Sequence, residues 1–160
     1  MIRKIIFFLI LIIFLNSCKK DDPIYEINQI NASSYNANKN KLKTPSQYIS
    51  ILYANLFQKA LSPNELVEIT RCIESVGDKQ IVHEVIISNF MNKEGVSIPS
   101  DSLMREDLNL FLEETYKRFY VRDITEAERE YFLNFFASHP NVSSEMVYMA
   151  FSLSNEYQFY

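Results

Sequence analysis

The sequence predicts an all-α protein of about six helices, arranged as two tandem three-helix units that form one compact domain. Only two of the 160 residues are glycine, and long stretches place apolar residues at helical spacing. Three helix-start signals also recur, each a Ser or Thr followed three residues later by Glu or Gln. The domain is expected over 44–160, with copies at about 44–95 and about 100–160.

The first copy is expected to contain three helices. Thr44-Pro45-Ser46-Gln47 supplies an N-cap, a proline at the first helical position and a capping glutamine, and predicts a helix over about 45–60. A second helix starts after Ser62 and should end at Gly77, where glycine can take the left-handed conformation. A third is expected over about 79–91. The residues expected to face inward are Tyr48, Ile49, Leu52, Tyr53, Leu56, Phe57, Leu66, Ile69, Ile73, Val76, Ile81, Val82, Val85, Ile86 and Phe90.

The second copy is also expected to contain three helices. The first of them spans about 101–121, and the next starts after Thr125 and ends before Pro140. Asn141 or Ser143 can cap the last. The expected apolar positions are Leu103, Leu108, Phe111, Leu112, Tyr116, Phe119, Tyr120, Phe132, Leu133, Phe135, Phe136, Met146, Val147, Ala150, Phe151, Leu153 and Tyr157.

An offset of 63 residues aligns the two copies. It pairs like with like at core positions and at capping positions, which indicates an internal duplication. Coincidence among amphipathic helices is the alternative. The aligned pairs are Ile49/Leu112, Tyr53/Tyr116, Leu56/Phe119, Phe57/Tyr120, Lys59/Arg122, Leu61/Ile124, Ser62/Thr125, Glu65/Glu128, Ile69/Phe132 and Ile73/Phe136.

The N-terminal residues have the layout of a secretory signal. Arg3 and Lys4 precede an unbroken apolar run from Ile5 to Leu15, and the small residue Ser17 follows. The run has 11 residues. As a helix it would reach ~16 Å, about half of a ~30 Å hydrocarbon core. A permanent membrane-spanning helix is therefore not expected.

Leu15-Asn16-Ser17-Cys18 resembles the lipobox of bacterial lipoproteins. The resemblance implies removal of residues 1–17, acylation of Cys18 and anchoring of the mature chain in a membrane through two or three acyl chains. One chain alone binds a membrane only marginally. The alternative is that Cys18 is an ordinary cysteine of a signal sequence.

Lys19-Lys20-Asp21-Asp22 directly follows this cysteine and is similar to the surface-export signal of lipoproteins in the Bacteroidota. The resemblance implies an outer-membrane lipoprotein exposed on the cell surface. An outer-membrane lipoprotein that faces inward, with these residues as a charged spacer, is the alternative.

Residues 18–43 are expected to form a lipidated, flexible tether. From Asp22 onward the stretch is rich in Asn, Ser and Lys, and its few apolar residues show no sustained period. Such a chain has a root-mean-square reach of ~25 Å, enough to hold the domain clear of the lipid headgroups. The alternative is that Ile24 to Ile30 docks on the domain or on another protein.

Charge and cysteine content exclude some classes of function. The mature chain would carry 14 basic and 20 acidic residues, a net charge of about −6, so no nucleic-acid partner is expected. With Cys18 acylated, Cys72 has no partner for a disulfide within the chain. Cys72 is expected to be a buried, inert thiol.

The helical region also resembles the repeats of phycobilisome-linker-like domains. The residues that match are Leu52-Tyr53, Lys59, Ser62-Pro63-Asn64-Glu65 and Ser154-Asn155-Glu156-Tyr157. The resemblance covers about 44–160 and implies a fold and an interaction role, without chemistry.

No catalytic residues, metal site or cofactor are expected. The acidic residues Glu113, Glu114, Glu126, Glu128 and Glu130 lie at helix starts or on polar faces, where solvated or capping roles are expected. Neither a calcium loop nor a glycine-rich phosphate loop is present.

The expected function is that of a non-catalytic accessory subunit, which binds a protein partner in an outer-membrane complex. The alternative is a surface receptor that binds a glycan or an apolar ligand through the tyrosine-rich second copy. The residues expected to contact a partner are Tyr148, Tyr157, Phe159 and Tyr160.

Overall fold

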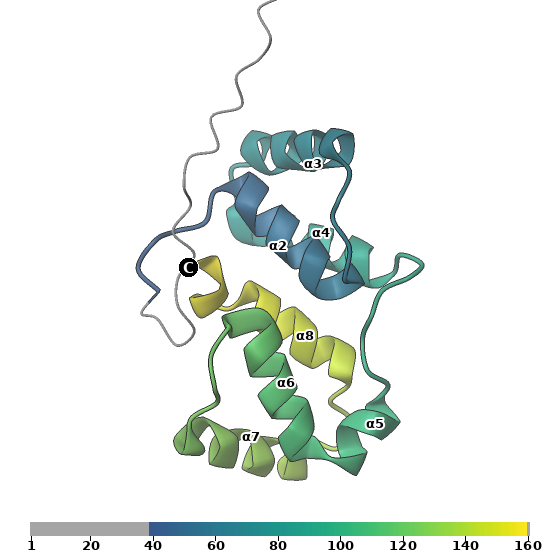
Figure 1. The fold of residues 1–160 in the computed structure, drawn as a ribbon, viewed down its shortest axis with the longest axis vertical. Helices are drawn as coiled ribbons and strands as arrows, with labels where there is room; N and C mark the ends of the chain where they lie inside the picture. Colours follow the sequence, from purple (N-terminus) through teal and green to yellow (C-terminus); the bar gives the residue numbers. More distant parts are fainter. Residues whose placement is uncertain (1–38, 160) are drawn as a thin grey trace, which may run out of the picture. The chain divides into compact units, whose positions relative to one another are not determined.

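The computed structural model describes residues 39–159 (Figure 1). The predicted signal peptide 1–17, Cys18, the charged residues Lys19 to Asp22, most of the predicted tether and Tyr160 lie outside the described residues. Within 39–159 the structure contains seven α-helices and one short 3₁₀-helix, joined by loops, and its one β-bridge is isolated. The all-α prediction is confirmed.

The first copy consists of α2 (Pro45–Phe57), α3 (Pro63–Ser75) and α4 (Lys79–Met91). Each begins where a side chain accepts a hydrogen bond from the first helical turn: Thr44 in a full capping box, Ser62, and Asp78. The predicted starts of these three helices are confirmed. Gly77 was predicted to end α3 by taking the left-handed conformation, and this is wrong. The helix ends at Ser75, and Gly77 does not have a positive φ.

The second copy consists of α6 (Leu108–Tyr120), α7 (Glu126–Ser138) and α8 (Ser144–Leu153), followed by the 3₁₀-helix η2 (Glu156–Gln158). The predicted single helix over 101–121 is wrong. It is two helices, α5 (Asp101–Glu106) and α6, separated at Asp107 with φ −141° and ψ 87°. The Asp107 carboxylate accepts a hydrogen bond from the Leu110 N–H at 2.9 Å, so this residue ends one helix and caps the next.

The duplication is visible in the helix boundaries. α2 and α6 have 13 residues each, as do α3 and α7, and each pair is displaced by 63 positions. Both α2 and α6 end in a left-handed residue, Gln58 (φ 54°) and Val121 (φ 52°), again 63 positions apart. The short helix α5 is the connection between the copies. The two tandem three-helix units predicted from the sequence are therefore present.

Val121 is expected to be a strained position. A β-branched residue in the left-handed region is a steric outlier, and left-handed backbone costs roughly 1–2 kcal/mol for an L-residue. Val121→Asn is expected to raise the free energy of unfolding by about 1 kcal/mol, measured by urea denaturation, because asparagine tolerates this conformation. Gln58→Asn is the matched control, with a smaller gain since Gln58 is not β-branched. Loss of stability in Val121→Asn would contradict the argument.

The two copies share one hydrophobic core. The third helices of the copies, α4 and α8, contact each other, and Figure 1 shows α8 running between the helices of the first copy and α6. Stacked aromatic pairs occupy matching places: Tyr48 lies 4.2 Å from His83, and Phe111 lies 6.1 Å from Tyr148, between ring centroids. Burial lowers the pKa of His83, whose half-buried ring therefore favours the neutral form.

Residues 39–43 pack against the C-terminal end of the domain, and we call them the strap. Leu42 forms an antiparallel bridge with Phe159, and the Lys43 N–H donates to the Gln158 carbonyl at 2.8 Å. The Lys43 ammonium donates to the Tyr157 carbonyl and lies 4.1 Å from the centre of the Tyr157 ring. The predicted boundary at residue 44 is therefore wrong, because the strap belongs to the domain.

Candidate functional site

An apolar groove of about 450 Å³ lies between α7 and α8 in the second copy. Tyr120 of α6 also lines it. The complete lining consists of Tyr120, Tyr131, Phe132, Phe135, Phe136, Val142, Met146, Val147, Ala150, Phe151 and Ser154. This volume falls in the range of ~300–1,000 Å³ that is usual for binding sites.

The groove has a buried floor and an exposed apolar rim. Phe136, Val147 and Phe151 form the floor and belong to the core. On the rim, the Tyr131 and Met146 side chains are 64% and 60% exposed. Large apolar side chains with this exposure, grouped around a concave surface, are typical of a binding site.

The sequence of α7 explains why its apolar surface is too wide for the core. Five of the six residues from Tyr131 to Phe136 are aromatic or leucine. A helix that covers a core on one side needs an apolar stripe only somewhat wider than about 100°. Phe136 is the one buried residue of α7, and Tyr131, Phe132 and Phe135 also line the groove.

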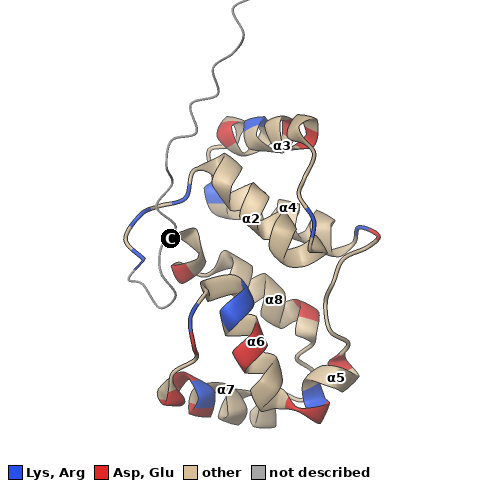
Figure 2. Ribbon diagram, viewed as in Figure 1, with Lys and Arg blue, Asp and Glu red and all other residues tan. Residues whose placement is uncertain are grey.

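Ring contacts order the aromatic side chains around the groove. Tyr131 stacks on Phe135 with 6.3 Å between centroids, and Phe135 stacks on His139 at 4.3 Å. Phe132 contacts Phe151 across the groove at 5.8 Å. Aromatic rings fixed in this way lose little conformational entropy when a partner binds. Figure 2 shows that charged residues occupy the start of α7, whereas its later turns and most of α8 carry none.

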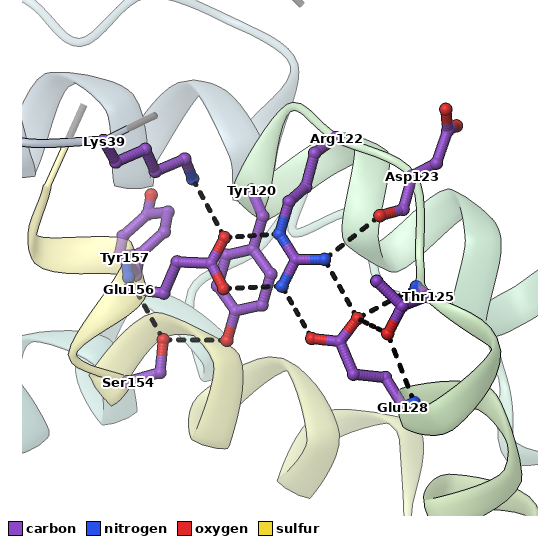
Figure 3. Close-up of polar contacts among 9 residues, drawn as sticks. All are labelled: Lys39, Tyr120, Arg122, Asp123, Thr125, Glu128, Ser154, Glu156 and Tyr157. Atoms are coloured by element: carbon purple, nitrogen blue, oxygen red, sulfur yellow. Dashed lines mark hydrogen bonds and ion pairs between the residues drawn. The ribbon is translucent and has the colours of Figure 1, made fainter. Parts of the chain in front are cut away.

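An ion-pair cluster lies beside Tyr120, one of the residues that line the groove (Figure 3). Arg122 donates from Nε and Nη2 to the two carboxylate oxygens of Glu156, at 2.6 and 2.7 Å. It also donates from Nη2 and Nη1 to the carboxylate of Glu128, at 2.7 and 3.0 Å. The Tyr120 hydroxyl donates to the Ser154 hydroxyl oxygen at 2.8 Å, and the guanidinium lies 5.6 Å from the Tyr120 ring centre.

The cluster fixes three segments of chain and shifts the pKa values of its members. Hydrogen bonds from Arg122 lower the pKa of Glu128 to about 2, and bonds to both carboxylates raise the pKa of Arg122. Lys39 of the strap lies 3.7 Å from the Glu156 carboxylate. Two cations thus balance two anions, and each carboxylate has a cationic partner. Paired in this way, the charged groups stabilise the contacts of η2 with α7 and with the strap, and they are not arranged for acid–base catalysis.

The predicted contact residues do not assemble into one exposed site. Tyr148 and Tyr157 are only 3% and 0% exposed, so the prediction that they contact a partner is wrong. Both lie in the core, where their rings pack on Phe119. Phe159 is partly exposed but pairs with the strap.

Two further predictions concern single residues of the helices. Cys72 was expected to be buried but is exposed, because Ile73 is the one fully buried residue that α3 contributes to the core. Glu128 was expected to have a capping role, and this is confirmed. Its carboxylate accepts from the Thr125 N–H at 2.9 Å in a complete capping box.

Sequence reasoning assigned Met146 to the core and did not single out the groove. The signal that could have found it is the run of aromatic residues in α7, which is wider than one buried stripe. Among residues 39–159, no three His, Cys, Asp or Glu side chains are grouped to hold a metal ion. None of the helices in this part of the chain is long and apolar enough to cross a membrane.

Comparison with known proteins gives no relative from which a role could be transferred: no family model, curated protein or solved structure matches this chain.

Proposed function

We propose that this chain is a non-catalytic outer-membrane lipoprotein, anchored by acylated Cys18 and exposed on the cell surface, that serves as an accessory subunit of an envelope complex. The observation that carries the interaction role is the exposed apolar groove between α7 and α8. The membrane address is supported by the lipobox-like residues before Cys18 and by the lysines and aspartates after it.

The occupant that best suits the groove is an amphipathic helix of the partner protein. Helices bind by laying an apolar face into a groove of this kind, with anchors at positions i, i+3, i+4 and i+7. The rim supplies aromatic and methionine side chains, which are frequent at protein interfaces. Complete burial of an exposed apolar side chain contributes ~1.5–3 kcal/mol, so Tyr131 and Met146 together can support binding of a short helix.

A second candidate function is that of a surface receptor for an apolar ligand. The same groove supports it, because the volume of about 450 Å³ is sufficient for a small molecule. A glycan suits the groove less well. The polar groups of its lining are confined to the hydroxyls of Ser154, Tyr120 and Tyr131 and the backbone, whereas a sugar needs many hydrogen-bond partners.

The test is photocrosslinking in cells that make the full-length lipoprotein. A benzophenone amino acid in place of Tyr131 is expected to give one discrete protein adduct, and mass spectrometry of it should identify an apolar helical segment of an envelope protein. Adding Met146→Glu should reduce the adduct about tenfold, because a carboxylate in an apolar contact costs at least ~1.4 kcal/mol.

Val67→Glu is the matched control, since Val67 is an exposed valine on α3, outside the groove. It should leave the adduct unchanged. A lipid or small-molecule adduct would favour the receptor instead. Absence of any adduct, or equal loss in both variants, would overturn the role of the groove.

A further inference from the structure

A second pocket, of about 470 Å³, is lined by the strap, by α2, α3 and α4 of the first copy, and by the C-terminal end of the domain. Its described lining consists of Leu42, Lys43, Pro45, Tyr48, Ile73, Lys79, Gln80, His83, Leu153, Asn155 and Gln158. None of these residues lines the groove between α7 and α8, so the pocket and the groove are separate sites.

The lining of this pocket combines apolar and basic side chains. Tyr48 and Ile73 are each 1% exposed and supply apolar surface from the core. The Tyr48 ring stacks on the ring of His83, with 4.2 Å between centroids. Lys43, Lys79 and His83 are basic, whereas no Asp or Glu is among the described lining residues. Apolar walls with a few convergent polar groups are typical of small-molecule sites, and basic groups favour an anion.

The ammonium of Lys43 is partly buried and has no carboxylate partner among residues 39–159. It donates to the Tyr157 carbonyl and lies 4.1 Å from the centre of the Tyr157 ring. Burial, reinforced by the positive charge of Lys39, lowers the pKa of Lys43 to about 8. Because a charge removed from water is costly unless it is paired, a bound anion would relieve this cost and raise the pKa again.

Lys79 adds a second positive charge, which backbone carbonyls hold in place at the end of α3. Its ammonium donates to the carbonyl oxygens of Ile73 and Val76, both at 2.6 Å, and to that of Glu74 at 3.3 Å. Carbonyl oxygens carry no net charge, so the positive charge of the ammonium is kept. Burial and this charge together lower the pKa of His83. A cation fixed in this way is preorganised for an anionic ligand.

The acidic residues next to the lining in the sequence are engaged elsewhere or exposed. They are Glu74, Asp78, Glu84 and Glu156, and none of them lines the pocket. The Asp78 carboxylate caps α4, where it accepts from the N–H of Gln80 at 3.0 Å. Glu84 accepts from the Gln80 amide, and Glu156 is paired with Arg122. Within the part of the chain that the structure describes, the basic groups of the pocket therefore have no counterion.

We propose that this pocket binds a small organic carboxylate, whose charged group is attracted by Lys43 and Lys79 and whose apolar body packs against Tyr48 and the other apolar side chains of the lining. An inorganic anion would leave the apolar surface without a partner. A neutral apolar molecule would bury the Lys43 ammonium further without pairing it. The volume of about 470 Å³ lies in the range of ~300–1,000 Å³ that is usual for such ligands.

Titration of the purified full chain with sodium benzoate, in a mild detergent, tests this site. The chain has two histidines, so NMR can follow the ring of His83, which lines the pocket, beside that of His139, which does not. Benzoate is expected to shift the His83 signal saturably, with a Kd of the order of mM for so small a ligand. Benzamide has the same shape without the charge, and sulfate has charge without an apolar body. Each should bind about tenfold more weakly or less.

Two variants change the charge of the pocket. Lys43→Met keeps the methylene chain but removes the ammonium, and should weaken benzoate binding about tenfold. It also removes the hydrogen bond to the Tyr157 carbonyl, so a second variant leaves the strap unchanged. Gln80→Glu places a carboxylate in the lining and should weaken binding by a similar factor. The fold tolerates it, because an acidic residue is favourable in the first turn of a helix.

Lys59→Met is the matched control, since it removes an exposed lysine that does not line the pocket, and it should leave benzoate binding unchanged. Circular dichroism checks that each variant is folded. The proposal is overturned by the absence of a saturable His83 shift, by equal binding of benzamide, by a His139 shift as large as that of His83, or by unchanged binding in Gln80→Glu.

Discussion

Replacing Leu112 by alanine should lower the free energy of unfolding by about 3 kcal/mol, within the ~2–5 kcal/mol usual for a buried leucine. Leu112 is a residue of α6 and is 0% exposed. Its truncation leaves a cavity in the core that the surrounding helices fill only in part. Urea denaturation followed by circular dichroism measures the change. One transition is expected, because α4 and α8 join the copies into a single core.

Two matched variants accompany this measurement. Leu110 lies on the same helix with its side chain 50% exposed, and Leu110→Ala should cost less than about 1 kcal/mol. Ile49 is the equivalent of Leu112 in the first copy and is also fully buried, so Ile49→Ala should cost about as much as Leu112→Ala. Separate unfolding of the two copies, or equal effects at Leu110 and Leu112, would contradict the shared core.

Arg122→Met should lower the free energy of unfolding by about 2 kcal/mol at pH 7, because it removes the bidentate partner of two carboxylates. Glu128 and Glu156 would then face each other, with Lys39 the remaining cation that Figure 3 shows on Glu156. The side chains are partly exposed, so the cost stays below that of a fully buried pair. Thermal and urea denaturation measure it. Lys59→Met is the control, since exposed Lys59 is the equivalent of Arg122 in the first copy and should change little.

The same variant should change the pH dependence of stability. The pKa of Glu128 is about 2 in the folded protein, against an ordinary value of 4.5. Its stabilisation is therefore complete above pH 4.5 and is lost as the pH falls from 4.5 to 2. In Arg122→Met this decline should be smaller, since the guanidinium is the main cause of the shift. An equal decline in both proteins would show that other carboxylates dominate acid unfolding.

Local signals predicted most of the helices well. Capping pairs such as Thr44 with Gln47 and Thr125 with Glu128 fix helix starts by contacts within four residues, and such contacts are present in the sequence itself. The left-handed ends of α2 and α6, Gln58 and Val121, also lie 63 positions apart, but the sequence did not predict them. Asp107 was missed because aspartate can either break a helix or lie on its polar face.

The missed features depend on contacts between distant parts of the chain. Lys43 holds the strap in place through hydrogen bonds to Gln158 and Tyr157, more than 100 positions away. No local sequence pattern predicts such a contact. The groove exists because α7 carries more apolar surface than its neighbours cover, which depends on the spacing of packed helices. The burial of Tyr148 likewise depends on packing between distant helices, because this residue of α8 contacts Phe111 and Phe119 of α6.

The attachment of the strap to the C-terminal end has a mechanical consequence. Tension applied through the N-terminal residues enters the domain at Lys39 and meets the Leu42–Phe159 bridge and the Lys43 hydrogen bonds before it reaches α2. These contacts are few and lie outside the helices, so they are expected to open before α2 unfolds. The strap would then lengthen the chain under load while the helices stay folded.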